Sequence, residues 1–127
     1  MVAEVPTTIV HFEIPADNIE RANKFYGSLF GWKIEKMPGP TEYWMFMTTN
    51  ASGGGIMKRQ TPDQVITNYI GVDSVDRYAK KVQELGGKVK VPKTEVPGFG
   101  WFAVCADTEN NTFAIWEANP QHQQQQQ

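Results

Sequence analysis

The stretch that decides the fold is residues 11–32, HFEIPADNIERANKFYGSLFGW. It begins inside Thr8–Ile14, a run of β-branched and aromatic residues that predicts a strand ending at Pro15. Alternate side chains of a strand point to opposite faces, so His11 and Glu13 share one face and the apolar residues share the other. The strand is therefore expected to pack its apolar face under a helix and to carry ionisable groups on its second face.

The same stretch continues as an amphipathic helix. Apolar residues recur at three- and four-residue spacing from Ile19 to Phe30, which predicts a helix with one apolar face. Asp17 or Asn18 can cap its N-terminus, and Gly31 is typical of a helix C-terminus. Three further strands are expected at residues 32–36, 43–49 and 53–57. The first half of the chain therefore reads βαβββ.

The second half of the chain repeats this order. Strands are expected at residues 68–72, 88–91, 101–106 and 112–117, with a helix after the first strand and a loop at 92–100. His11 and Asn68 lie 57 positions apart, as do Trp44 and Trp101. An internal duplication of this kind predicts two tandem βαβββ modules, at about residues 8–57 and 68–117. Together they form one α+β domain over residues 1–120, followed by a disordered glutamine-rich tail at 121–127.

Composition excludes several classes of protein. The 127 residues carry a formal charge of -2 and no basic stripe, so no nucleic-acid partner is expected. No run approaches the roughly 18 apolar residues of a membrane span, and the first residues do not resemble a signal peptide. The single cysteine, Cys105, rules out an internal disulfide framework and fits a reducing compartment. A cytoplasmic location is therefore expected.

Several short motifs occur in order along these elements: His11–Pro15, Arg21–Tyr26, Leu29–Trp32, Gly54–Met57 and Asp107–Glu117. Each motif is weak alone. Together they resemble the vicinal oxygen chelate superfamily, which groups glyoxalases, bleomycin-resistance proteins and extradiol dioxygenases.

This resemblance covers roughly residues 8–118 and carries its own implications. It implies that the two modules form a cupped mixed sheet, with the helices on the convex side and a small-molecule site in the cup. It also implies a homodimer, because members of this length often dimerise. In metal-dependent members, three or four His and Glu side chains from the first and fourth strands bind one divalent ion, such as Zn, Ni or Fe.

The repeat places four residues at the positions of those ligands: His11, Glu117, Met57 and Asn68. An amide and a thioether are poor donors for these ions, and two ligands fall short of the three that a catalytic metal normally has. Glu13 lies on the same face as His11 and is a further candidate. The alternative is that His11 and Glu117 hydrogen-bond each other or water. The metal site is therefore expected to be degenerate.

The expected wall of the cup is aromatic and rich in sulfur. Its candidate substrate-binding residues are Trp44, Phe46, Met57, Asn68, Phe99 and Trp101. The glycines around Phe99 allow the loop at residues 96–100 to act as a lid, and the alternative is a simple turn with Phe99 tucked back.

Three functions follow from these residues and from the resemblance. The first is a glyoxalase-like lyase or isomerase, in which Glu117, or less readily Glu13, abstracts a proton next to a carbonyl. The second is a metal-free module that binds or sequesters an aromatic or drug-like small molecule. The third is an extradiol dioxygenase, whose iron site would need a histidine where Asn68 stands.

Overall fold

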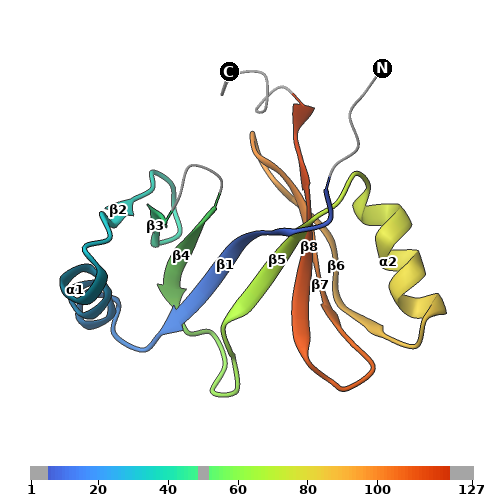
Figure 1. The fold of residues 1–127 in the computed structure, drawn as a ribbon, viewed down its shortest axis with the longest axis horizontal. Coiled ribbons are helices and arrows are strands. Elements are labelled where there is room, and N and C mark those ends of the chain that lie inside the picture. Colours follow the sequence, from blue (N-terminus) through green and yellow to red (C-terminus); the bar gives the residue numbers. More distant parts are fainter. Residues whose placement is uncertain (1–5, 49–51, 121–127) are drawn as a thin grey trace. The chain divides into compact units, whose positions relative to one another are not determined.

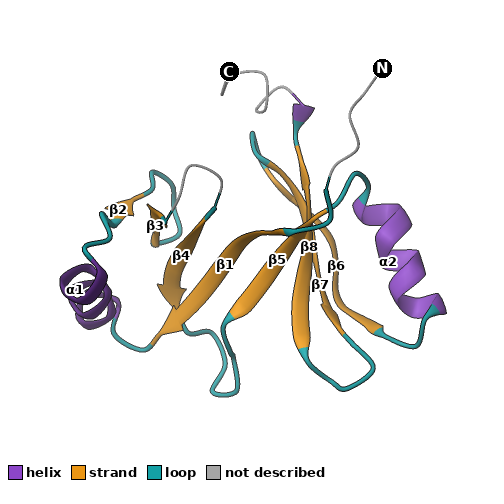
Figure 2. Ribbon diagram, in the orientation of Figure 1, coloured by secondary structure: helices purple, strands orange, loops and turns teal. Residues whose placement is uncertain are grey.

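The computed structural model describes residues 6–48 and 52–120. The chain divides into two compact units, one formed by residues 10–68 and the other by residues 69 onward together with the N-terminal residues through Ile9. Each unit is built around one βαβββ module, and we describe the modules separately (Figures 1 and 2). The expected glutamine-rich tail lies outside the described residues.

Module one contains four strands and one helix. Its elements are β1 (Ile9–Ala16), α1 (Ile19–Phe30), β2 (Glu35–Lys36), β3 (Tyr43–Met47) and β4 (Gly53–Lys58). The strand order is β2-β3-β4-β1, in which β1 pairs with β4 in parallel and the other pairs are antiparallel. The βαβββ order expected for the first half of the chain is confirmed.

The helix α1 begins and ends where its capping residues predict. The side chain of Asn18 accepts a hydrogen bond from the backbone N–H of Arg21 at 2.9 Å, which satisfies one of the unpaired donors of the first turn. Gly31 has a left-handed backbone with φ of 73°, and its N–H donates to the carbonyl of Gly27 at 2.9 Å.

The core of module one lies between its sheet and α1. Phe46 and Ile56 are almost completely buried there, and Ile14 of β1 joins them beside Ile19 of the helix. Aromatic rings fill the same layer, with Trp32 stacked on Phe46 at a centroid distance of 4.3 Å. The apolar face of β1 thus packs under α1 as the alternation of its sequence predicts.

Module two repeats the arrangement. Its elements are β5 (Thr67–Gly71), α2 (Val75–Glu84), β6 (Lys88–Val96), β7 (Gly100–Ala106) and β8 (Thr112–Ala118). The strand order is β5-β8-β7-β6, in which β5 and β8 are parallel. The helix α2 contacts β6, β7 and β8 (Figure 2). The α+β class and the two βαβββ modules are therefore confirmed.

The core of module two lies between its sheet and α2. Its buried members are Val72, Val75, Ala103, Cys105 and Ile115. Cys105 has no exposed surface, and its burial raises the pKa of the thiol. In this environment Cys105 behaves as a small buried hydrophobe.

Two strands continue past a proline at which the sequence predicts that they end. β1 continues through Pro15 to Ala16, because proline lacks only the N–H and its fixed φ is compatible with extended backbone. The prediction of a loop from Pro92 onward is wrong as far as Val96, because β6 continues to that residue. The pairing of β6 with β7 shifts register twice between Val89 and Thr94, and such irregularities accommodate a proline within a strand.

No helix in the described part of the chain combines the length and the apolar character that crossing a membrane requires.

Candidate functional site

The strand β1 carries His11 and Glu13 on the sheet face opposite α1. Their neighbour Ile14 is buried in the α1-side core, so alternation directs His11 and Glu13 to the other side of the sheet. We call this sheet face, opposite α1, the distal face of module one. Both side chains are half-buried there.

A third polar residue, Tyr43 of β3, connects these two side chains. Its hydroxyl lies 2.8 Å from Nε2 of His11 and donates to Oε2 of Glu13, also at 2.8 Å. Sequence reasoning missed Tyr43. Its position in the strand offered a signal, because Tyr43 alternates with Trp44 and Phe46 and therefore faces away from the core. We call this hydrogen-bonded chain, His11–Tyr43–Glu13, the relay.

The strand β4 separates β3 from β1, and its glycines make room for the relay. A Cβ atom built at Gly55 would lie 2.1 Å from the hydroxyl oxygen of Tyr43, far inside van der Waals contact. A Cβ at Gly53 would lie 2.9 Å from the sulfur of Met47. At Gly55, only glycine therefore lets the Tyr43 ring lie across β4. A Cβ at Gly53 would meet the backbone oxygen of Phe46 even before it met Met47.

The relay has a defined polarity. Burial lowers the pKa of His11 to about 4, so its imidazole is neutral at pH 7. The single hydroxyl hydrogen of Tyr43 is donated to Glu13, so the tyrosine oxygen accepts from His11. The hydrogen-bond network thus assigns the proton of His11 to Nε2.

Methionines flank the relay. Met45 of β3 and Met57 of β4 are half-buried, and Met47 is 58% exposed. All three belong to the distal face by strand alternation. Phe46, between Met45 and Met47, and Ile56, next to Met57, point into the α1-side core. Methionine is unbranched and polarizable, and it adapts to ligands of varied shape.

Glutamates belong to the distal face. Glu35 of β2 pairs with Met45 and joins Glu13 on this face, and the Lys33 ammonium lies 3.8 Å from a carboxylate oxygen of Glu35. Lys36 pairs with Trp44 and therefore lies on the α1 side. Lys58 comes directly after Met57 in β4, so alternation places it on the α1 side as well. Among the described strand residues of module one, no Lys or Arg belongs to the distal face.

Glu117 occupies a different environment. Its Oε1 accepts a hydrogen bond from the backbone N–H of Val75, the first residue of α2, at 2.9 Å. Two residues earlier in β8, Ile115 is buried in the α2-side core. Glu117 therefore lies on the α2 side of its sheet, where its carboxylate satisfies the helix N-terminus.

The strand registers show why the repeat misassigned this position. Trp101 pairs with Glu117, whereas the equivalent Trp44 pairs with Ile56 rather than with Met57. The counterpart of Glu117 is thus a core residue of module one. A shift of one residue moves a side chain to the opposite face of a sheet.

The predicted wall residues do not gather on one surface. Phe46 is 2% exposed in the α1-side core, with Trp44 packed against that core. Trp101 packs against the α2-side core, and the ammonium of Lys93 lies 5.3 Å from its ring centroid. Of the predicted wall residues in module one, Met57 belongs to the distal face.

The remaining predicted wall residues, Asn68 and Phe99, belong to module two. Asn68 of β5 is exposed and alternates with Tyr69, which forms an edge contact with Phe102. The side chain of Phe99 is 41% exposed in the turn between β6 and β7. The N–H of Phe99 donates to Val96 at 2.9 Å and its carbonyl accepts from Asn119 at 2.7 Å, so hydrogen bonds hold the turn at both sides.

The residues present do not fit a divalent metal. Among the described residues, no three His, Cys, Asp or Glu side chains are grouped so that they could hold an ion. The sheet face of module two opposite α2 carries Tyr69, Phe102, Val104, Ala114 and Trp116, and none of these provides an imidazole, carboxylate or thiolate. We therefore derive no step through a metal.

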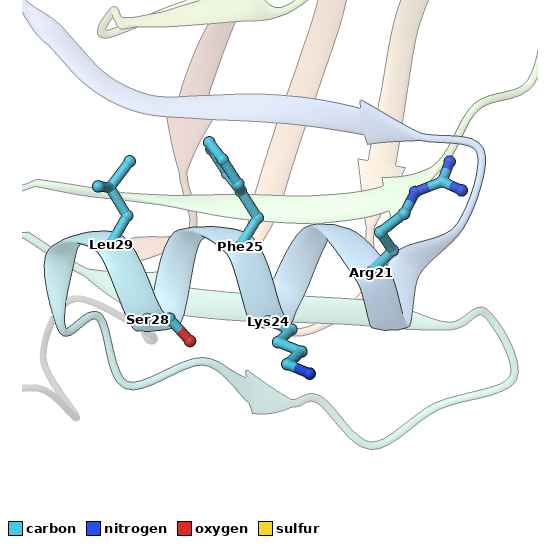
Figure 3. A pocket seen from close by; sticks show the side chains of 5 residues that line it. All are labelled: Arg21, Lys24, Phe25, Ser28 and Leu29. Carbon is cyan, nitrogen blue, oxygen red and sulfur yellow. The ribbon is translucent and has the colours of Figure 1, made fainter.

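Two of the surface hollows in the described residues lie beside α1. One of about 510 Å³ lies along α1 and is lined by Arg21, Lys24, Phe25, Ser28 and Leu29 (Figure 3). It contains no predicted site residue. The other, of about 460 Å³, lies beside the start of α1, and Trp44 lines it near Glu42, which accepts from the indole N–H at 3.0 Å.

Known proteins resemble this chain in sequence. Residues 8–49 match the family described as bleomycin resistance protein-like N-terminal. A glyoxylase-like domain-containing protein of Didymella fabae is 35% identical over 115 residues, covering 81% of this chain and 88% of that protein. The chain belongs to the glyoxylase-like family. It is thereby a member of the vicinal oxygen chelate superfamily, as its motifs predict.

Other relatives of this glyoxylase-like chain are longer. The glyoxylase-named CFP32 of Mycobacterium tuberculosis is 29% identical over 106 residues, covering 77% of this chain and 41% of that protein. The anthracycline biosynthesis protein DnrV of Streptomyces peucetius is 28% identical, covering 83% of this chain and 45% of that protein. The chain thus spans less than half the length of these two relatives.

Solved structures share the fold at low identity. A hypothetical protein, BH1468 of Bacillus halodurans, has a TM-score of 0.72 at 14% identity, covering 89% of this chain and 95% of its own. Methylmalonyl-CoA epimerase of Mycobacterium tuberculosis has a TM-score of 0.70 at 11% identity, covering 95% of each chain. These likenesses show the glyoxylase-like fold.

Proposed function

We propose that this glyoxylase-like protein binds a small organic molecule on the distal face of module one, without a metal ion. The observation that carries the proposal is the relay itself. Three polar side chains from two strands are joined by hydrogen bonds of 2.8 Å on the sheet face opposite the α1-side core. Polar groups fixed beside adaptable apolar side chains are the usual composition of a small-molecule site.

The charges of this face select the ligand class. Glu13 places a carboxylate at the relay, and His11 is neutral at pH 7. An anionic ligand would meet like charge at Glu13, which is unfavourable. We therefore infer a neutral or cationic ligand with an apolar body that contacts Met45, Met47 and Met57.

The similarity to a bleomycin-resistance-like model over residues 8–49 supports binding. This range contains all three relay residues and excludes module two. A methylmalonyl-CoA epimerase that shares the fold has been solved in complex with methylmalonyl-CoA, an anionic thioester. The distal face of module one offers such a ligand no described Lys or Arg from its strands, so this chain is expected to differ in ligand.

A second candidate function is proton transfer next to a carbonyl. One observation favours it: Glu13, a potential base, shares the relay with the hydroxyl of Tyr43. The Glu13 carboxylate would take the proton from carbon, and the Tyr43 hydroxyl would turn from Glu13 to donate to the enolate oxygen. Delivery of the proton from Glu13 to a different atom of the enolate would complete an isomerisation. Glu13 replaces Glu117 in this role, because Glu117 caps α2.

Binding is tested with probes that share one ring and differ in charge. These are 2-phenylethylamine, 2-phenylethanol and phenylacetate, measured by saturation-transfer NMR on the full chain. We expect the amine and the alcohol to bind more tightly than phenylacetate. We expect Glu13→Gln to abolish the preference for the amine over phenylacetate. Glu95→Gln is the matched control on exposed β6. Preferential binding of phenylacetate would contradict the proposed ligand class.

The enzymatic alternative is tested by hydrogen–deuterium exchange. A base acting next to a carbonyl exchanges the proton at that carbon with D₂O, and NMR follows the loss of its signal. Exchange in wild type that is lost in Glu13→Gln would favour the enzyme over simple binding. Binding without exchange would favour the binding module.

Two further expectations stay predictions. A homodimer is tested by sedimentation equilibrium, in which a monomer mass would refute it. The cytoplasmic location is tested by fractionating the cells of the source organism and probing the fractions for the native protein.

A further inference from the structure

The ring of Tyr43 lies against the backbone of Gly55, and we call this contact the seat of Tyr43. The seat determines which side chains the tyrosine hydroxyl can reach. The three atoms nearest to a Cβ built at Gly55 all belong to the Tyr43 side chain, at 2.1, 2.3 and 2.6 Å. The ring therefore lies directly on the backbone of β4. From there its hydroxyl reaches His11 and Glu13 on the far strand of the three.

We propose that Tyr43, seated on Gly55, is the positioning residue of the distal face, which fixes the protonation and orientation of both His11 and Glu13. This inference rests on the proposed function, because it names what prepares the same site for a ligand. Tyr43 acts through its neighbours, so we describe it as positioning rather than catalytic.

The geometry of the hydroxyl carries the argument. A phenol has one hydrogen to donate, and Tyr43 donates it to Glu13. The tyrosine oxygen then accepts from His11, which fixes the proton of the imidazole on Nε2. A relay of this polarity keeps Glu13 an acceptor and favours ligands that bring hydrogen-bond donors, such as an amine or an alcohol.

Two residues explain why the tyrosine holds this place. Gly55 provides the space, and the pairing of Tyr43 with Met57 sets the strand register that aligns its ring with the neighbouring glycine. A side chain at position 55 would push the ring away from β1. The relay therefore depends on Gly55, a residue that has no side chain and takes no part in the hydrogen bonds of the relay.

The test measures the tautomer of His11 by ¹⁵N NMR of the full chain at pH 7, with Tyr43→Phe as the main variant. This variant removes one oxygen and keeps the ring on Gly55. We expect protonated Nε2 in wild type and a changed Nε2/Nδ1 ratio in Tyr43→Phe. The inference is overturned if wild type carries its proton on Nδ1, or if the variant leaves the ratio unchanged.

A double-mutant cycle tests the seat. Gly55→Ala alone is expected to lower stability, and in the Tyr43→Val background the same change is expected to lower it much less, because the clashing ring is gone. An equal loss in both backgrounds would overturn the seat. If Gly55→Ala does not fold alone, folding of the double variant supports the seat, and failure of both overturns it.

Ligand binding separates this inference from the proposed function. With 2-phenylethylamine as the probe, Tyr43→Phe is expected to bind about tenfold more weakly, the effect of one lost hydrogen bond of ordinary strength. If no probe binds but the tautomer responds to Tyr43→Phe, the proposed function fails and the positioning role stands. If probes bind equally well in both proteins and the tautomer is unchanged, the positioning role fails alone.

Discussion

The ring of Tyr43 lies on the backbone of Gly55, so closely that a Cβ at Gly55 would come within 2.1 Å of the tyrosine hydroxyl. This relationship joins the outer strand β3 to β1 across the strand between them. It brings a phenol, an imidazole and a carboxylate together on the distal face of module one. A glycine that reads as a weak strand residue in the sequence is thus a requirement of the candidate site.

The first prediction concerns two glycines with opposite responses to the same substitution. Gly55→Ala is expected to cost about 1–3 kcal/mol, because the added methyl overpacks the contact with Tyr43. Gly27→Ala in α1 is the control. Its Cβ would meet its nearest neighbour at an ordinary 3.5 Å, so helix propensity predicts a gain of up to about 1 kcal/mol. Urea unfolding measures both, and equal effects would contradict the prediction.

The second prediction concerns pH. Burial lowers the pKa of His11 to about 4, against 6.5 for the unfolded chain. The unfolded state therefore takes up this proton first, and the contribution of neutral His11 is complete above pH 6.5 and is lost as pH falls toward 4. Its full size is at most about 3 kcal/mol. Urea unfolding at pH 7.5 and 4.5 is the measurement.

The His11→Gln variant isolates this contribution, because all other groups titrate in both proteins. Wild type is expected to lose more stability than the variant between the two pH values. An identical loss in both proteins would show that the pKa of His11 is the same in the folded and unfolded states.

The third prediction concerns Glu117, which holds the N-terminus of α2. Glu117→Ala is expected to cost about 1–2 kcal/mol, because the N–H of Val75 loses its acceptor. Probe binding at the distal face of module one is expected to stay unchanged. Thermal unfolding and saturation-transfer NMR measure the two effects. Abolished binding in a folded Glu117→Ala protein would restore Glu117 as a site residue.

The fourth prediction concerns metals. Calorimetric titration with Zn, Ni and Fe(II) is expected to show no stoichiometric binding tighter than about 1 mM, because the described residues provide no three-ligand group. Chelator treatment is expected to leave the unfolding midpoint unchanged. A tight one-to-one complex whose affinity falls in His11→Gln would contradict this expectation.

Periodicity predicted most of the fold. The alternation of β1 and the caps at Asn18 and Gly31 are local features, and each is found where the sequence places it. The predicted apolar stripe of α1 is buried only in part, because Phe25, Leu29 and Phe30 are more than half exposed. The extension of β6 through Pro92 was not predicted, because the register shifts that accommodate it are a property of the pairing with β7.

The candidate site was less accessible from sequence. His11 and Glu13 are two residues apart on one strand, so alternation alone brings them together. Tyr43 joins them through the registers of β3, β4 and β1, which a sequence does not display. Glu117 was placed with Met57 by counting along the repeat, and one residue of register moved it to the helix side.

The central claim is that a small molecule binds at the relay on the distal face of module one. The most direct measurement is a titration of methyl-¹³C-methionine protein with 2-phenylethylamine, with the methyl signals assigned by single Met→Leu variants. The account predicts saturable shifts of Met45, Met47 and Met57 that are strongly reduced in Glu13→Gln. The account is contradicted if these three methyl signals do not move, or if they move equally in Glu13→Gln.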